Sequence, residues 1–106
     1  YKWQKFSREK SFDTFCPIGP FIKTNFEQHP ELGIKCFVNN ELKQDGNTRD
    51  MIFSIGDILC FVSSIMTLLP GDVILTGTPE GVSKVGPGDE IKIEIETIGT
   101  LVNSIK

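Results

Sequence analysis

The loop Thr76-Gly-Thr-Pro-Glu-Gly81 has residue types that suit ligand binding. A glycine at position 77 lets another group approach the backbone N–H closely, and Thr78 adds a hydroxyl donor. The alternative is a tight turn that ends a strand and needs only glycine and proline. The residues alone leave both interpretations open.

A second set of polar side chains lies near the start of the chain. Lys10 offers an ammonium group and Thr14 a hydroxyl, but each also fits an ordinary charged loop. Asp13 has no second acid nearby, so we do not expect it to be a base. The only histidine, His29, precedes Pro30 in a loop, where a surface role is expected.

Several other polar residues fit structural roles. Gln44, Asn47 and Thr48 either line or brace a site, or form a turn with side-chain to backbone bonds. Asp72 follows Pro-Gly and Asp89 follows Gly, so both are typical of turns.

Acids and cysteines give no metal or redox motif. Glu94 and Glu96 alternate with isoleucines on the wet face of a predicted strand, so we do not expect them to form a metal cage. Cys16, Cys36 and Cys60 have neither CxxC nor Cys/His zinc spacing. They are expected to be reduced, partly buried thiols in a cytosolic protein.

Composition and charge narrow the function classes. The 106 residues make one domain at most. The formal net charge is −3 and the pI about 5.1, which gives no electrostatic reason to expect nucleic acid or an anionic membrane as partner. No apolar run is long enough to predict a transmembrane helix.

The first half of the chain is predicted to be loop followed by a hairpin. Residues 1–33 show no sustained period and contain several prolines and glycines. Residues 34–44 are typical of a hairpin that turns at 39–40, because asparagine tolerates positive φ. Residues 45–47 indicate a second turn, and residues 51–53 predict a short apolar strand.

One clear helix is predicted to begin at Ser54, where Asp57 completes a pattern like a capping box. Pro70-Gly71 should end the segment. An apolar stripe at helical spacing is expected to pack in the core. It consists of Ile55, Ile58, Leu59, Val62, Ile65 and Met66.

The last part is predicted to be sheet. Residues 73–75 predict a buried strand, and residues 90–96 alternate strictly, which predicts a strand with one wet face. Residues 98–99 turn the chain into a last strand at 100–105. Strands outnumber helices, so the predicted fold class is α+β, mainly β, with one clear helix.

Four stretches carry a resemblance to a known family. They are Lys10-Ser-Phe-Asp-Thr-Phe-Cys-Pro-Ile-Gly-Pro20, then Gln44-Asp-Gly-Asn-Thr48 with Met51-Ile-Phe53, then Leu69-Pro-Gly-Asp-Val-Ile-Leu-Thr-Gly-Thr-Pro-Glu-Gly-Val82, and finally Gly88-Asp89 with Ile95-Glu96, Gly99, Leu101 and Asn103. In order and spacing they resemble the motifs of the fumarylacetoacetate hydrolase (FAH) family.

The resemblance implies that residues 1–106 are the C-terminal portion of a single FAH-like catalytic domain, a partial mixed β-sandwich roll. It implies an enzyme of 2-oxo or 2,4-dioxo acids, serving aromatic compound catabolism in the cytoplasm. The reaction is C–C bond hydrolysis, decarboxylation or keto–enol isomerisation through an enolate stabilised by Mg²⁺ (or Mn²⁺ or Ca²⁺). A homodimer is expected for the full-length protein.

The same resemblance implies roles for individual residues. Lys10 would be catalytic and bind the substrate carboxylate or the developing enolate, and Gly77 and Thr78 would bind the substrate carboxylate. Thr14 would lie next to the metal. The family's main metal ligands precede the KSFDTF motif and are absent here, so the chain alone is expected to be inactive.

Two hypotheses from different classes stay open. The chain is either a fragment of such an enzyme or a truncated, non-catalytic module that keeps the roll for dimerisation or partner binding. It opens at Tyr1 rather than at a methionine, which fits either a trimmed or an incomplete sequence. The missing metal-ligand motifs favour an incomplete gene product or a cut fragment. The sequence does not choose the substrate or the reaction.

Overall fold

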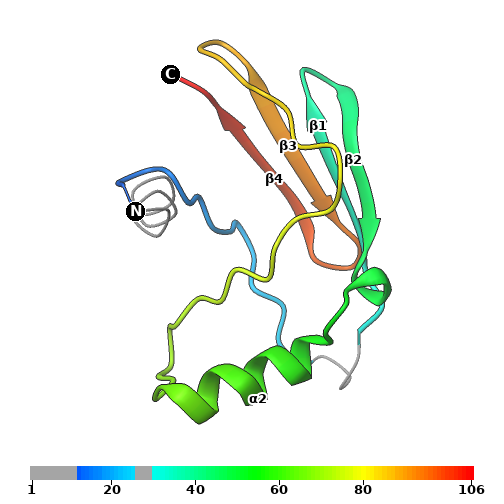
Figure 1. The fold of residues 1–106 in the computed structure, drawn as a ribbon. Coiled ribbons are helices and arrows are strands. Elements are labelled where there is room, and N and C mark those ends of the chain that lie inside the picture. Colours follow the sequence, from blue (N-terminus) through cyan, green and yellow to red (C-terminus); the bar gives the residue numbers. More distant parts are fainter. Residues whose placement is uncertain (1–11, 26–29) are drawn as a thin grey trace, which may run out of the picture.

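The structure, a computed structural model, describes residues 12–25 and 30–106. These residues form an antiparallel sheet of four strands in the order β2-β1-β3-β4, and one α-helix (Figure 1). Within them, no helix is long and apolar enough to span a bilayer. The elements are β1 (Gly33–Val38), β2 (Glu41–Asn47), the 3-10 helix η1 (Thr48–Asp50), α2 (Ile55–Ile65), β3 (Glu90–Ile95) and β4 (Gly99–Ser104).

The predicted hairpin is present as β1 and β2, and it turns at Asn39 and Asn40. Both residues have positive φ, at 50° and 66°, as a tight hairpin turn requires. The Asn39 amide also donates to Asp89 Oδ1 at 2.8 Å, and its oxygen accepts from the backbone of Glu90 at 2.9 Å. One side chain therefore joins the hairpin turn to the start of β3.

Asp89 has the turn role that the sequence predicts. Its other carboxylate oxygen accepts from the backbone N–H of Gly86 at 2.8 Å. The hydrogen bonds from Asn39 and Gly86 favour the charged carboxylate and lower the pKa of Asp89. Asp72 is a turn residue of the same kind, and it accepts from the backbone of Leu69 at 2.8 Å.

The predicted second turn at residues 45–47 is wrong, because these residues continue β2 and pair with residues 33–35. The pairing shifts register between Cys36 and Phe37, so Lys43 has no residue opposite it and forms a β-bulge. The bulge and the backbone bonds to β1 keep residues with turn propensity in an extended strand.

The capping box of α2 is confirmed. Ser54 Oγ accepts from the backbone of Asp57 at 3.1 Å, and the Asp57 carboxylate accepts from the backbone of Ser54 at 3.1 Å. The helix ends at Ile65, earlier than Pro70, and the cap residue Met66 donates its N–H to Val62 at 3.0 Å.

The expected packing of the apolar stripe in a core is not seen. Helix α2 lies apart from the sheet (Figure 1). Ile55, Ile58 and Val62 are half-buried, whereas the other three stripe residues are exposed. Among the described residues no apolar side chain is fully buried. The stripe therefore has no partner of its own within this part of the chain.

The predicted strands at 51–53 and 73–75 are also wrong. Neither segment is a strand, and Ile52 and Leu75 are 93% and 60% exposed. A strand needs a neighbour to complete its backbone hydrogen bonds, and neither segment pairs with one here. An apolar run indicates which surface tends to be buried, but it does not supply the partner.

The remaining expectations for the sheet are confirmed within a residue or two. The strand predicted at 90–96 is β3, and the strand predicted at 100–105 is β4. The wet face of β3 is partly covered, because Lys92 lies over the ring of Phe37 at 4.4 Å and pairs with Glu94 at 3.0 Å. The chain is thus mainly β with a single α-helix in its described part, as predicted.

Candidate functional site

The loop at residues 77–81 is fastened to β2 by the side chain of Gln44. Its amide nitrogen donates to Thr78 Oγ1 and to the carbonyl of Pro79, both at 2.8 Å, and approaches the carbonyl of Glu80 at 3.3 Å. Gln44 is half-buried in β2 and is one residue beyond the bulge at Lys43. The sequence left open whether Gln44 lines a site, braces it or forms turn bonds, and these contacts favour bracing of the loop.

Two glycines let the loop and the strand meet closely. Gly81 has a φ of +97°, and a Cβ atom there would collide with the carbonyl of Lys43. A Cβ atom on Gly46 would approach the ring of Pro79 to 3.0 Å. The position of the loop against β2 thus depends on the absence of side chains at these two residues.

Gly77 and Thr78 form the open part of the loop. Gly77 has a φ of +102°, and a Cβ atom there would meet nothing within 4 Å. Thr78 is exposed. Among the described residues, the space where a Cβ atom of Gly77 would stand and the exposed side chain of Thr78 are therefore open to a small ligand. The chemistry available here is hydrogen bonding to an anionic oxygen.

Lys10, the residue predicted to be catalytic, and His29 lie outside the described residues. Thr14 and Asp13 are exposed within a turn closed by a hydrogen bond from Phe15 N to Phe12 O at 3.0 Å. Thr14 has a φ of +70°, which is rare for a β-branched residue. No hydrogen bond joins Thr14 to the loop at 77–81, so its metal-adjacent position stays a prediction.

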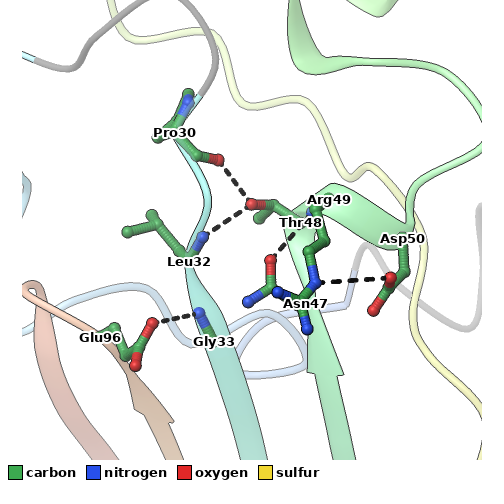
Figure 2. A network of polar contacts seen from close by, with 8 residues as sticks. All are labelled: Pro30, Leu32, Gly33, Asn47, Thr48, Arg49, Asp50 and Glu96. Atoms are coloured by element: carbon green, nitrogen blue, oxygen red, sulfur yellow. Dashed lines mark hydrogen bonds and ion pairs between the residues drawn. The ribbon is translucent and has the colours of Figure 1, made fainter.

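Thr48 and Asn47 have structural roles rather than lining the site. Thr48 Oγ1 donates to the carbonyl of Pro30 at 2.6 Å and accepts from the backbone of Leu32 at 2.9 Å (Figure 2). Asn47 accepts from the backbone of Arg49 at 3.0 Å and caps η1. These side-chain to backbone bonds are the structural alternative that the sequence left open.

The two glutamates at the end of β3 also have protein partners. Glu96 accepts from the backbone N–H of Gly33 at 2.7 Å and holds the start of β1 (Figure 2). Glu94 pairs with Lys92. Within residues 12–25 and 30–106, no three His, Cys, Asp or Glu side chains gather where they could hold a metal ion. The described residues therefore do not fit a metal cage.

The described thiols are unpaired, in line with the expected reduced state. The expected partial burial is wrong for Cys16 and Cys60, which are exposed. Cys36 is half-buried in β1, and this burial raises the pKa of its thiol. A raised pKa leaves less of the nucleophilic thiolate. Cys36 is thus a packing residue on the sheet.

Sequence reasoning missed Gly81 and Lys43 as parts of the site. Gly81 was recognised only as one residue of a polar loop, because nothing local shows what its backbone will approach. The bulge at Lys43 arises from pairing with β1, a long-range event. The sequence signal that could have indicated both is the glycine at each end of Gly77-Thr-Pro-Glu-Gly81, which is unusual for a turn that needs only one.

Comparison with known proteins agrees with the fold. Among curated proteins, the chain is 52% identical over 102 residues to an uncharacterized protein of Methanocaldococcus jannaschii. This alignment covers 96% of this chain and 43% of that protein. It is 50% identical over 100 residues to the 4-hydroxyphenylacetate degradation bifunctional isomerase/decarboxylase of Salmonella dublin. This alignment covers 92% of this chain and 23% of that protein.

Solved structures give the same result. The 5-carboxymethyl-2-hydroxymuconate delta-isomerase of Mycobacterium smegmatis superposes with a TM-score of 0.87 at 42% identity, over 97% of this chain and 42% of that one. The maleylpyruvate hydrolase of Sphingobium sp. SYK-6, in complex with manganese(II) and pyruvate, gives 0.83 at 44% identity, over 88% and 36%. The chain spans less than half the length of each of these relatives.

The family profile described as the C-terminal part of fumarylacetoacetate (FAA) hydrolase matches residues 1–106, the whole of the chain. The four motifs, the sheet with its single described helix and the superposed structures all agree with that match. The chain therefore belongs to the fumarylacetoacetate hydrolase family.

Proposed function

We propose that this chain is the C-terminal portion of the catalytic domain of an enzyme that acts on 2-oxo or 2,4-dioxo acids. Its loop at 77–81 binds the carboxylate of the substrate. The reaction is C–C bond hydrolysis, decarboxylation or keto–enol isomerisation, each of which passes through an enolate. Relatives named as an isomerase/decarboxylase and as a maleylpyruvate hydrolase support this range of chemistry.

One observation carries the proposal. The loop presents an open glycine backbone at Gly77 and a hydroxyl at Thr78, and Gln44 holds it against a strand of the sheet. Donors that are fixed before the substrate arrives stabilise an anion better than donors that must reorganise. A carboxylate accepts bonds from both kinds of donor.

We assign Lys10 and Thr14 to the same proposed site as further polar groups, as the family resemblance implies. The ammonium group of Lys10 would pair with the carboxylate or the developing enolate. The positive φ of Thr14 supports a functional turn, because strained backbone is found preferentially at functional sites.

A divalent cation, Mg²⁺ or else Mn²⁺ or Ca²⁺, is part of the proposal for the complete enzyme. The manganese ion in the maleylpyruvate hydrolase structure supports a divalent metal. Such an ion, when bound, polarises a carbonyl oxygen. The described residues do not form a cage. We assign its main ligands to residues outside this chain, as the family resemblance implies.

The surface of the chain supports the proposal that it is one portion of a larger domain. Apolar residues with large exposed fractions include Ile22 at 83%, Ile52 at 93% and Val82 at 74%. Apolar surface of this extent is normally covered by protein. We further propose a homodimeric, cytoplasmic enzyme of aromatic compound catabolism that does not bind nucleic acid or membranes.

Calorimetric titration tests this function on the complete gene product. Pyruvate in the presence of Mn²⁺ serves as the probe, with the 106-residue chain measured beside it. The complete protein should bind, and the short chain should bind weakly or not at all. Thr78→Val should weaken pyruvate binding about tenfold, the usual effect of losing a hydrogen bond to a charged group.

Thr76→Val is the matched control, since Thr76 is in the same segment and has no hydrogen bond to Gln44. It should leave binding unchanged. Tight binding by the short chain would show that the main metal ligands lie within it, contrary to our assignment. Binding by neither protein would favour the alternative, a non-catalytic module for dimerisation or partner binding.

A further inference from the structure

We propose that Gln44 is a positioning residue that fixes the direction of the Thr78 hydroxyl. The hydrogen of that hydroxyl then points away from β2 and toward the bound carboxylate. This inference rests on the proposed function of the loop at 77–81. It adds Gln44 to the two proposed donors, Gly77 and Thr78. Gln44 acts through Thr78 and does not itself touch the substrate.

The orientation of the Gln44 amide follows from its neighbours. The backbone carbonyls of Pro79 and Glu80 lie 2.8 and 3.3 Å from its terminal nitrogen. Carbonyl oxygens can only accept, so the end of the amide that faces them must be the NH₂ group. The same nitrogen lies 2.8 Å from Thr78 Oγ1.

The direction of the Thr78 hydroxyl then follows. An NH₂ group has two hydrogens and no acceptor, so one hydrogen serves the carbonyls and the other serves Thr78 Oγ1. Thr78 must accept from Gln44, and its own hydrogen cannot point back at that nitrogen. The hydroxyl therefore remains available to donate on its exposed side.

The bulge in β2 explains why Gln44 reaches the loop. An extra residue at Lys43 breaks the alternation of side chains and re-aims the residues that follow. Gly81 packs against the Lys43 carbonyl, so the loop contacts the strand directly at the bulge. The amide of Gln44 is thereby held against residues 78–80 of the loop.

Two substitutions separate positioning from simple support. Gln44→Glu replaces the NH₂ donor with an oxygen that accepts, so Thr78 would donate back toward β2. Gln44→Met has similar length and no hydrogen-bonding capacity. In the complete protein, Gln44→Glu should weaken pyruvate binding in Mn²⁺ by tenfold or more, and Gln44→Met by roughly threefold.

A matched control and a pH series accompany these variants. Asn47→Asp introduces the same charge on the same strand, where the acceptor for Arg49 is kept, and it should bind as the wild type does. Binding by Gln44→Glu should recover as the pH falls toward 4, because a protonated carboxyl group can donate again. Gln44→Met should show no such recovery.

A double-mutant cycle with Thr78→Val decides the question. If Gln44 acts through the Thr78 hydroxyl, Gln44→Met should weaken binding less than twofold further in the Thr78→Val protein. Full additivity would overturn the inference, because Gln44 would then only support the loop. Failure of Thr78→Val itself to weaken binding would instead reject the proposed carboxylate site. Melting temperatures of all variants show whether each one folds.

Discussion

At the scale of single residues, the position of the loop depends on Gly81. Its φ of +97° disfavours any other residue, and the Lys43 carbonyl occupies the place where a Cβ atom would stand. Gly71 has the same φ of +97° but open space around it. A substitution at Gly71 thus measures the cost of backbone strain alone. A substitution at Gly81 measures that strain together with the steric clash.

Alanine substitution at the two glycines should give different losses of stability. Gly71→Ala should lower the free energy of unfolding by about 1–2 kcal/mol, the usual penalty for backbone that suits only glycine. Gly81→Ala should cost at least about 1 kcal/mol more, because the loop must also move away from β2. Urea unfolding of the complete protein measures both, and equal losses would show that the clash is relieved at no cost.

Residue roles could be predicted only where the chemistry is local. The turn roles of Asp72 and Asp89 follow from neighbours within three residues, and the structure confirms them. The role of Gln44 depends on a loop 34 residues further along the chain, and nothing local distinguishes a residue that lines a site from one that braces it. Local hydrogen bonds are visible in a sequence, whereas contacts made by folding are not.

At the scale of elements, α2 depends on its capping box because, within the described part of the chain, no other element packs extensively on it. Ser54→Ala removes the acceptor for the Asp57 N–H and should destabilise the protein by about 1 kcal/mol. Ser63→Ala is the control, since Ser63 lies inside the same helix and donates only to the carbonyl of Cys60. It should be neutral or slightly stabilising, because alanine favours helix.

Circular dichroism during urea unfolding checks this pair of variants. Equal loss for Ser54→Ala and Ser63→Ala would mean that the end of the helix is stabilised by contacts other than the cap.

The elements predicted correctly are those with local signals. The helix start and the turn at Asn39 and Asn40 each depend on residues adjacent in sequence. The strands expected at 51–53 and 73–75 failed because a strand exists only when a neighbour pairs with it. The turn expected at 45–47 failed for the opposite reason, since pairing with β1 overrides turn propensity.

At the scale of the whole molecule, exposed apolar residues predict a covering surface in the complete protein. Ile52 is 93% exposed here. Ile52→Ser should have little effect on the stability of the 106-residue chain, but it should cost the complete protein about 1–3 kcal/mol if the residue is buried there. Thermal unfolding of both proteins measures this difference, and equal effects would argue that Ile52 remains on the surface.

The family could be recognised from the sequence because its motifs are contiguous and keep their order. The extent of exposed apolar surface could not, since it depends on what else is present in space. The apolar stripe of α2 shows this: its periodicity predicts the helix correctly, but not whether anything packs against it.

The loop that carries Thr78 also lies along β2, an outer strand of the sheet. Outer strands have unpaired backbone groups that can recruit strands from other molecules. A loop seated on the bulge at Lys43 shields part of that edge. Substitutions that release the loop would therefore do more than disturb the proposed carboxylate site: they would also expose a template for aggregation.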